Sequence, residues 1–310
     1  RCWTLADEKI IKLKNKIEKI GKPLKEWNVK IYFGIKTGFN DAFIITTEKR
    51  NEIISNCKTR EERERTEKII KPILRGRDIG KYYYKWAGWW IIKIESGWTN
   101  QNRLKESPEE FFKRIYPSVY NYFISFKDKI SKGKGLINRD DQGDFWWELR
   151  DCDYYQEFEK EKIIYPDISP RLSFAYDNKY FLNNTCYFIN SGSKYLLGVL
   201  NSKLIEFYYK QISSQLGKNV IRSFTIFIEK IPIPFISGKN KYIKSEVENL
   251  VNRILSLTQY EDKLNSHYSE NFIHEKTLIK EYERKIDNFI YELYELTDEE
   301  IKIVEEETSN

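Results

Sequence analysis

Two aspartates and a lysine near the middle of the chain have the types and order found in one class of metal-dependent nuclease. Pro166-Asp167 and Asp177-Asn178-Lys179 follow the PD-(D/E)xK outline, in which two carboxylates hold a divalent metal and the lysine assists the attacking water. No further acidic metal ligand stands upstream, and Asp177-Asn178 equally suits a hairpin turn. A nuclease is therefore kept as an alternative, and no metal site is predicted.

The segment Lys71–Ile79 has residues suited to contact with nucleic acid. It places Arg75 and Arg77 around Gly76, with Lys81 just beyond and an aromatic run from Tyr82 to Trp90 after it. The planar fork of arginine reads guanine bidentately, and glycine lets backbone approach a phosphate. The structural alternative is an Arg77–Asp78 pair that only holds a loop.

A second basic segment precedes Trp146–Arg150. Lys132-Gly-Lys134-Gly and Arg139-Asp-Asp-Gln-Gly143 predict a polar, flexible loop that could enter a DNA groove. The alternative is an exposed connector backed by structural tryptophans.

The other candidate sites for chemistry are weak. Gly34-Ile-Lys-Thr-Gly38 lacks the order of a phosphate-cradling loop, because a strand rather than a helix is expected after it. The four cysteines include no CxxC pair, so isolated reduced thiols are expected. His267 and His274 suit a surface or interface better than a catalytic pair. No catalytic residue is predicted.

Charge is divided unevenly along the chain. Residues 241–310 contain 9 Lys/Arg and 17 Asp/Glu, a net of −8, whereas residues 1–240 carry 44 against 30, a net of +14. A basic surface gains affinity for a polyanion by counterion release, and an acidic segment is repelled by it. Any nucleic-acid surface is therefore expected before residue 240, although a Lys-rich composition also suits plain solvated surface.

Composition bounds the class of protein. With 310 residues, including 22 Tyr, 18 Phe and 8 Trp, the chain can bury a core without disulfides. No apolar run approaches the roughly 18 residues of a membrane-spanning helix, and the amino end lacks a secretory signal. The chain contains no Met and begins with Arg1, so we expect a segment of a longer protein. The isolated thiols favour a cytoplasmic protein, and no membrane contact is expected.

Residue spacing predicts a mixed, β-rich body with interspersed helices and a helical carboxyl-terminal region. We expect an α+β fold with a mainly antiparallel, curved sheet. Helices are expected over about 7–20, from Ser107 with a break at Pro117, over 193–213, and in several segments after Tyr242. Strands are expected at 29–35 and 42–46, paired as a hairpin, and at 82–94, 162–169, 172–176, 180–190 and 224–228.

Several segments, in order, resemble a known family. They are Gly34-IKTGFNDAFII45, Ile70-KPILRGRDI79, Trp146-WELR150, Lys162-IIYPDIS169, Tyr195-LLGVLNSKLIEFYYKQIS213 and Ile231-PIP234. Together they resemble the TaqI-like C-terminal specificity domain, the target recognition module of adenine-specific DNA methyltransferases and of fused type IIG restriction–modification enzymes. The flanks, around Trp3 and at Ile290–Glu305, are similar to those of such proteins.

The resemblance implies a division of labour. An upstream domain would bind S-adenosylmethionine and methylate adenine, a nuclease domain would also lie upstream in fused forms, and this module would choose the sequence of double-stranded DNA. The expected organisation is a linker helix at 1–26, the specificity domain at 27–240 and an acidic helical tail at 241–310, with no cofactor in this segment. A protein-interaction module remains a further alternative.

The residues expected to contact DNA are basic residues of the first 240 positions: Arg75, Arg77, Lys81, Lys132, Lys134, Arg139, Arg150, Arg171, Lys218 and Arg222. Phosphate contacts are expected to outnumber base contacts among them.

Overall fold

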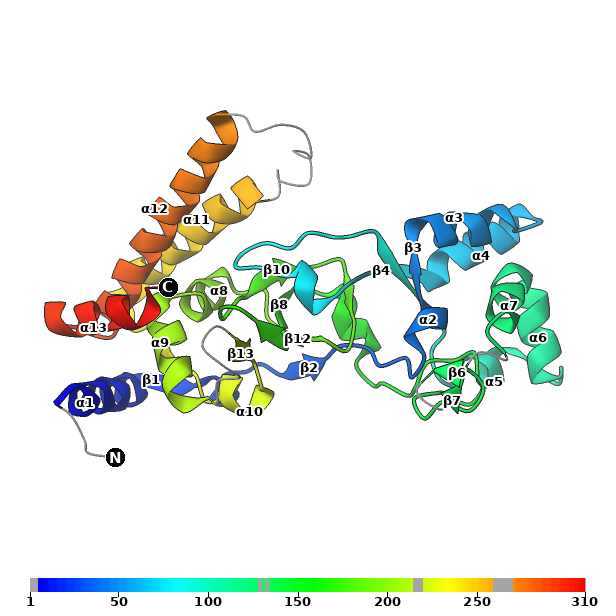
Figure 1. Cartoon of the computed structure of the whole chain (residues 1–310), viewed down its shortest axis with the longest axis horizontal. Coiled ribbons are helices and arrows are strands. Elements are labelled where there is room, and N and C mark those ends of the chain that lie inside the picture. The colour runs from blue at the N-terminus through cyan, green and yellow to red at the C-terminus, as the bar shows by residue number, and fades with distance from the viewer. Residues whose placement is uncertain (1–4, 128–129, 132–133, 214–219, 259–269, 310) are drawn as a thin grey trace.

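A computed structural model of the chain describes residues 5–127, 130–131, 134–213, 220–258 and 270–309. Figure 1 shows an elongated molecule in which helices gather at both ends and strands occupy the middle. Helices α1 (Leu5–Ile20) and α13 (Asp298–Thr308) lie at the same end, where Lys16 forms a 2.7 Å ion pair with Glu300. The first and last helices are thus joined directly.

Two four-stranded sheets form the middle of the molecule. The first has the order β10-β8-β12-β2 and is antiparallel throughout. The second has the order β11-β4-β5-β3, in which only the β11–β4 pair is parallel. The strands are β2 (Ile31–Phe33), β3 (Ile44–Thr46), β4 (Ile70–Leu74), β5 (Trp89–Ile92), β8 (Lys162–Pro166), β10 (Ala175–Asp177), β11 (Phe181–Leu182) and β12 (Cys186–Ile189).

Three two-stranded ribbons are also present among the described residues. They are β1 (Gly21–Pro23) with β14 (Pro232–Pro234), β9 (Ile168–Ser169) with β13 (Ile221–Arg222), and β6 (Ile130–Ser131) with β7 (Lys134–Gly135). All three are antiparallel. The β1–β14 ribbon ties the amino-terminal helix to a segment more than 200 residues later, because β1 follows α1 directly.

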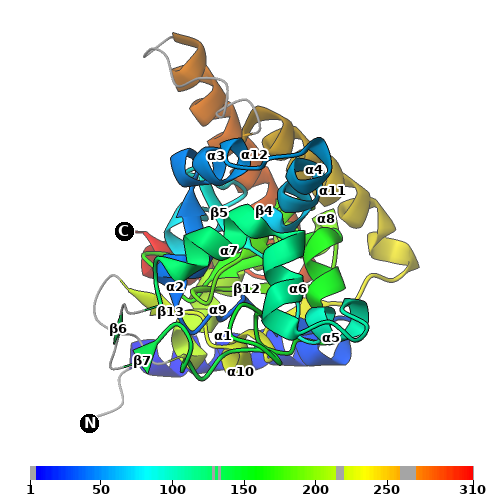
Figure 2. The same ribbon diagram turned by 90° about the vertical axis from the view of Figure 1, so that its right-hand side faces the viewer.

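Short helices cover the second sheet at one end of the molecule, which faces the viewer in Figure 2. They are α2 (Asn40–Phe43), α3 (Thr47–Ser55), α4 (Arg60–Ile69), α5 (Trp98–Asn102), α6 (Pro108–Ile115) and α7 (Pro117–Ile124), with η2 (Gly76–Asp78) and η3 (Tyr155–Glu159) nearer the middle. The Thr59 hydroxyl accepts the Glu62 backbone N–H at 3.1 Å and so caps α4. Pro117 begins α7, since proline fits the first turn of a helix but not its interior.

The other end is formed by helices of the carboxyl-terminal half of the chain. They are α8 (Lys194–Leu200), α9 (Lys203–Ile212), α10 (Thr225–Ile228), α11 (Lys241–Thr258) and α12 (Glu270–Leu293), with α13 and the single turns η1 (Leu24–Glu26) and η4 (Gly238–Asn240). Val247 and Ile254 of α11 and Ile290 of α12 are buried in one core with Leu197 of α8 and Ile163 of the first sheet. The acidic tail is therefore part of the body's core.

The α+β class and the helical carboxyl-terminal region are confirmed, with the strands divided between two sheets. The expected hairpin at 29–46 is wrong, because β2 and β3 belong to different sheets. The strand expected at 82–94 is reduced to β5, since Tyr82 has φ +68° and leaves the extended conformation. The segment 224–228 forms α10 instead of an edge strand.

Candidate nucleic-acid interface

The turn after β4 holds Arg75 inside the protein. The Arg75 guanidinium donates to both carboxylate oxygens of Asp78, at 3.0 Å from Nε and 2.8 Å from Nη2, and it lies 5.0 Å from the ring centre of Trp89. The Arg75 backbone N–H donates to the same carboxylate at 2.8 Å. A salt bridge does hold this loop, but it is formed by Arg75 instead of Arg77. Contact of Arg75 with DNA stays a prediction.

Gly76 and Arg77 follow this pair. A Cβ at Gly76 would stand 2.7 Å from the Thr185 carbonyl oxygen, and the Gly76 N–H donates to the Thr185 hydroxyl at 2.8 Å. Glycine is therefore required by approach to the protein's own backbone. Arg77 is exposed on η2, and among the described residues its side chain has no polar partner. It remains available for a ligand.

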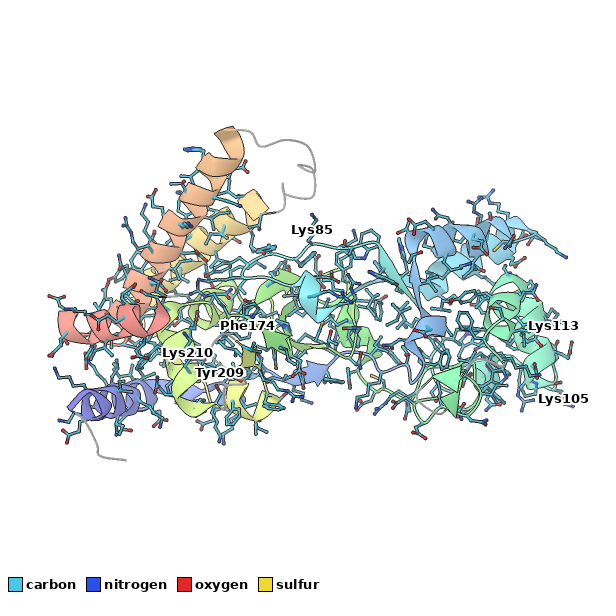
Figure 3. The ribbon with its side chains drawn as sticks, viewed as in Figure 1. Lys85, Lys105, Lys113, Phe174, Tyr209 and Lys210 are labelled. Atoms are coloured by element: carbon cyan, nitrogen blue, oxygen red, sulfur yellow. The ribbon has the colours of Figure 1, made fainter. Side chains whose placement is uncertain are left out.

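Lys81 connects the same loop to the tail. Its ammonium forms a 2.9 Å ion pair with Glu283 of α12. The next residue, Tyr82, is buried, and its N–H donates to the Phe174 carbonyl at 2.8 Å. Figure 3 labels Phe174 in the sheet region and Lys85 on the outer side of this loop. The loop therefore has one side fixed to the protein and an exposed basic residue, Lys85, which the sequence analysis did not include.

Arg139 is an interior residue, and this corrects its expected place on a DNA-facing loop. Only 1% of it is exposed. Its guanidinium donates to four backbone carbonyls, those of Thr37 at 2.8 Å, Leu136 at 3.0 Å, Trp146 and Glu148. Burial lowers the pKa of Arg139 to about 10, so it stays charged at neutral pH. Its role is to join two loops, and it leaves the set of proposed contacts.

Three other predicted arginines reach the surface while keeping a carboxylate neighbour. Arg150 lies 3.3 Å from Asp141 and Arg171 lies 3.1 Å from Glu206, with side chains 48% and 50% exposed. Arg222 lies 3.5 Å from Asp167. The Asp141 side chain is 34% exposed as well, so the Arg150–Asp141 pair contributes little to stability and phosphate contact would displace it at low cost. The side chains of Glu206 and Asp167 are only 9% and 19% exposed, so Arg171 and Arg222 have more buried partners.

Lys132 and Lys218 lie outside the described residues. The backbone of Lys134 belongs to β7, and its side chain is not described. These three residues stay predictions.

Arg50, which is absent from the predicted contacts, lies against the aromatic run that follows the Arg75 turn in sequence. Arg50 of α3 lies 4.3 Å from the ring centre of Trp90, and the Trp90 indole N–H donates to Thr47 at 3.0 Å. The sequence signal for the tryptophans was the aromatic run itself. Arg50 had no such signal, because it is distant in sequence and is brought there by the β3–β5 pairing.

The nuclease alternative is wrong in its geometry. Asp177 pairs with Lys162 at the first residue of β8, whereas Asp167 follows the last residue of that strand. The Asp177 carboxylate forms a fully buried 2.6 Å ion pair with Lys162 and accepts the N–H groups of Lys179 and Tyr180. Burial lowers the pKa of Lys162, and Asp177 opposes that shift. The two aspartates therefore cannot share a metal.

Two further observations concern other kinds of site. No group of three potential His, Cys, Asp or Glu metal ligands exists within the described part of the chain. In that part, no helix is long and apolar enough to cross a membrane. Cys57, Cys152 and Cys186 are free thiols, and burial raises the pKa of Cys186 well above its usual range.

Fold and site together define a binding module: an α+β scaffold whose exposed arginines stand on turns and ribbons around two sheets. The chain belongs to the TaqI-like C-terminal specificity domain family, whose sequence profile matches residues 71–233. It is therefore a specificity domain, the DNA-recognition module that the resemblance implied.

The chain is also similar to individual proteins. The type II methyltransferase M.MjaIV of Methanocaldococcus jannaschii is 25% identical over 240 residues, which cover 73% of this chain and 70% of the relative. The type IIL restriction–modification enzyme MmeI, whose structure was solved in complex with DNA, matches 91% of this chain with a TM-score of 0.58 and 15% identity. The type IIG restriction endonuclease BpuSI matches 94% with a TM-score of 0.47 and 15% identity. The chain spans 35% and 33% of those two proteins, about a third of each.

Proposed function

We propose that this chain selects a specific sequence of double-stranded DNA for a methyltransferase domain of the same polypeptide, which would methylate adenine. The family match over residues 71–233 carries the proposal. The net charge of +14 on residues 1–240, the exposed Arg77 of the η2 turn and the partly exposed Arg222 of the β9–β13 ribbon support it. We further propose that the whole protein is a type IIG enzyme, which also has a nuclease domain.

S-adenosylmethionine belongs to the upstream domain in this proposal. The chain contains no Asn-Pro-Pro-Tyr sequence, the loop expected of an adenine-specific active site, so its own residues do not fit the catalytic role. In this proposal, the residues of the chain bind the duplex and orient it. A prokaryotic cytoplasm is the expected compartment, since that is where such an enzyme meets DNA.

The test is a binding selection from a random duplex library, followed by gel shifts at low salt. We expect enrichment of one short motif, with affinity at least about a thousandfold above that for a scrambled duplex. Equal affinity for all duplexes, or none at low salt, would overturn the proposal and favour a protein-interaction module. The full-length protein should transfer methyl groups to the enriched motif, and the 310-residue chain alone should not.

A further inference from the structure

A tight turn, the 78–85 turn, follows β4 and η2. The Lys85 N–H donates to the Asp78 carbonyl at 2.8 Å, and the Gly80 N–H donates to the Tyr83 carbonyl at 2.8 Å. Tyr82, near the tip, has φ +68°, a backbone conformation that a bulky residue adopts only when its surroundings hold it there. Contacts from outside the turn must therefore fix its tip.

Contacts with three other segments hold the tip. The Tyr82 N–H donates to the Phe174 carbonyl at 2.8 Å, and the Tyr82 carbonyl accepts the hydroxyl of Thr258, the last residue of α11, at 3.4 Å. Lys81 forms a 2.9 Å ion pair with Glu283 of α12, and these two side chains are only 25% and 23% exposed. The segment before β10 and both long helices of the tail thus hold the turn in one position.

The outer side of the 78–85 turn carries side chains that are available for a ligand. Tyr83 is 44% exposed and Lys85 is exposed, and neither side chain has a polar partner among the described residues. Figure 3 labels Lys85 on this outer side. Residues 75–88 contain four Lys/Arg and a single acid, Asp78, which Arg75 neutralises. Ammonium and phenol groups are donors that contact DNA phosphates, so this side of the turn suits the backbone of a duplex.

Lys81 was expected to contact DNA itself, but Glu283 occupies its ammonium group. Resting on the proposed function, we propose that Lys85 and Tyr83 contact the phosphate backbone of the duplex and that Lys81 is a positioning residue, which holds their turn in place by pairing with Glu283. An acid of the tail then promotes the binding of a polyanion. Its charge alone would do the opposite, because removal of an acid normally raises the affinity of a protein for DNA.

The sign of this effect can be measured with two alanine variants of α12. Glu283→Ala releases Lys81, whereas Glu281→Ala removes an acid that pairs with Lys285 of the same helix. We expect Glu283→Ala to weaken binding about threefold to tenfold on cognate and scrambled duplexes at fixed salt, and Glu281→Ala to leave it equal or slightly tighter. Gel shifts run well below the melting temperature of each variant separate this effect from lost stability. A folded Glu283→Ala protein that binds as tightly as the wild type would overturn the positioning role.

Reversal of the ion pair distinguishes positioning from direct contact. Lys81→Glu should weaken binding, and the double variant Lys81→Glu/Glu283→Lys should restore the affinity to within about twofold, because the pair is rebuilt with its charges exchanged. A phosphate contact made by Lys81 itself would not be restored, since a glutamate would still face the DNA. A double variant as weak as Lys81→Glu would therefore overturn the inference.

Lys85→Ala tests the outer side of the turn. Loss of one phosphate contact should weaken binding on every duplex and make the slope of log affinity against log salt shallower by about 0.9. Unchanged affinity and slope would show that the turn does not face DNA, and would leave the proposed function standing if the wild type still selects a motif. Absence of any enriched motif for the wild-type protein would overturn the proposed function itself.

Discussion

Asp287 of α12 is a buried acid at the contact between the tail and the rest of the protein. Its carboxylate accepts the Lys203 backbone N–H at 2.8 Å, and Lys81, Lys203 and Glu283 are the charged groups near it. Burial raises the pKa of Asp287 to about 6, although Lys81 and Lys203 oppose the shift. The folded protein therefore holds this proton more tightly than the unfolded chain does.

This raised pKa fixes the sign of a pH dependence. Since the unfolded value is about 3.9, the contribution of Asp287 to the free energy of unfolding falls as pH rises from about 4 to about 6, by roughly 3 kcal/mol in all. Asp287→Asn keeps the acceptor oxygen and removes the ionisation. We expect this variant to be more stable than the wild type at pH 7.5 and equally stable near pH 4, measured by urea unfolding. Glu246→Gln, on an exposed part of α11, is the control, and a gain of the same size at both pH values would contradict the argument.

Residue types alone could place arginines near glycines but could not assign their partners. Arg75 and Arg77 both stand next to Gly76 in the sequence. In the structure, Asp78 forms a salt bridge with Arg75, and Arg77 stays exposed. Nothing in the sequence distinguishes Arg139 from a surface residue. Only the structure shows that four backbone carbonyls accept hydrogen bonds from it. Asp167 was recognised as chemically interesting, but its neighbour Arg222 is 55 positions later and meets it only through the β9–β13 pairing.

At the scale of helices and strands, the sequence predicted a boundary correctly where residues next to that boundary decide it. The helix start at Ser107 and the break at Pro117 were predicted because the deciding residues are adjacent to the helices. The helix expected at 193–213 is instead two helices. Asn201 ends α8, since its side-chain amide exchanges two hydrogen bonds with the backbone of Phe174, at 3.0 and 2.9 Å. Phe174 lies 27 residues away from Asn201, so the spacing of apolar residues in the expected helix could not predict this contact.

Glu62 stabilises the starts of two helices. One carboxylate oxygen accepts the Lys58 N–H at 2.8 Å before α4, and the other accepts the Ser118 N–H at 3.1 Å and the Ser118 hydroxyl at the start of α7. Burial raises the pKa of Glu62, but the hydrogen bonds from Ser118 and Lys58 outweigh it and the net shift is downward. The carboxylate therefore joins the α3–α4 and α6–α7 layers.

We expect Glu62→Ala to lower the free energy of unfolding by about 2 to 3 kcal/mol, because it leaves two helix starts without their acceptor. Glu61→Ala, at an exposed position of the same turn, should change it by less than about 0.5 kcal/mol. Urea unfolding of both variants provides the measurement. Equal effects would show that the bridge to Ser118 contributes nothing.

On the scale of the whole molecule, the acidic tail and the basic body are one folded unit. Gly198 of α8 lies so close to α11 that a Cβ there would stand 2.6 Å from Val247 Cγ1 and 3.1 Å from Val251 Cγ2. Composition shows the change of charge near residue 240, but it does not show that the helices after that point complete the core.

This close approach reverses the usual effect of alanine in a helix. Gly→Ala in a helix interior normally stabilises by about 1 kcal/mol. Here we expect Gly198→Ala to destabilise by about 1 to 3 kcal/mol, since the stiff valine side chain cannot move away freely. Adding Val247→Ala should restore part of the loss, so the double-mutant cycle would show coupling. A stabilised Gly198→Ala protein would mean that α8 and α11 do not pack as described.

The division of charge also sets how DNA binding should respond to salt. Counterion release contributes about −0.9 to the slope of log affinity against log salt for each neutralised phosphate, so about five contacts from residues 1–240 give a slope near −4.5. The side chains of Arg150 and Arg171 are 48% and 50% exposed, and Lys132 belongs to the Lys132-Gly-Lys134-Gly sequence, so each is expected to contact phosphate. We expect alanine at any of these three positions to weaken binding on every sequence and to make the slope shallower by about one.

Arg77→Ala should instead relax preference at a single base position, because its exposed guanidinium follows a turn fixed by Arg75 and Asp78. Salt titrations on cognate and scrambled duplexes separate the two classes, and an Arg77→Ala protein that lost affinity equally on both would make Arg77 a phosphate contact as well.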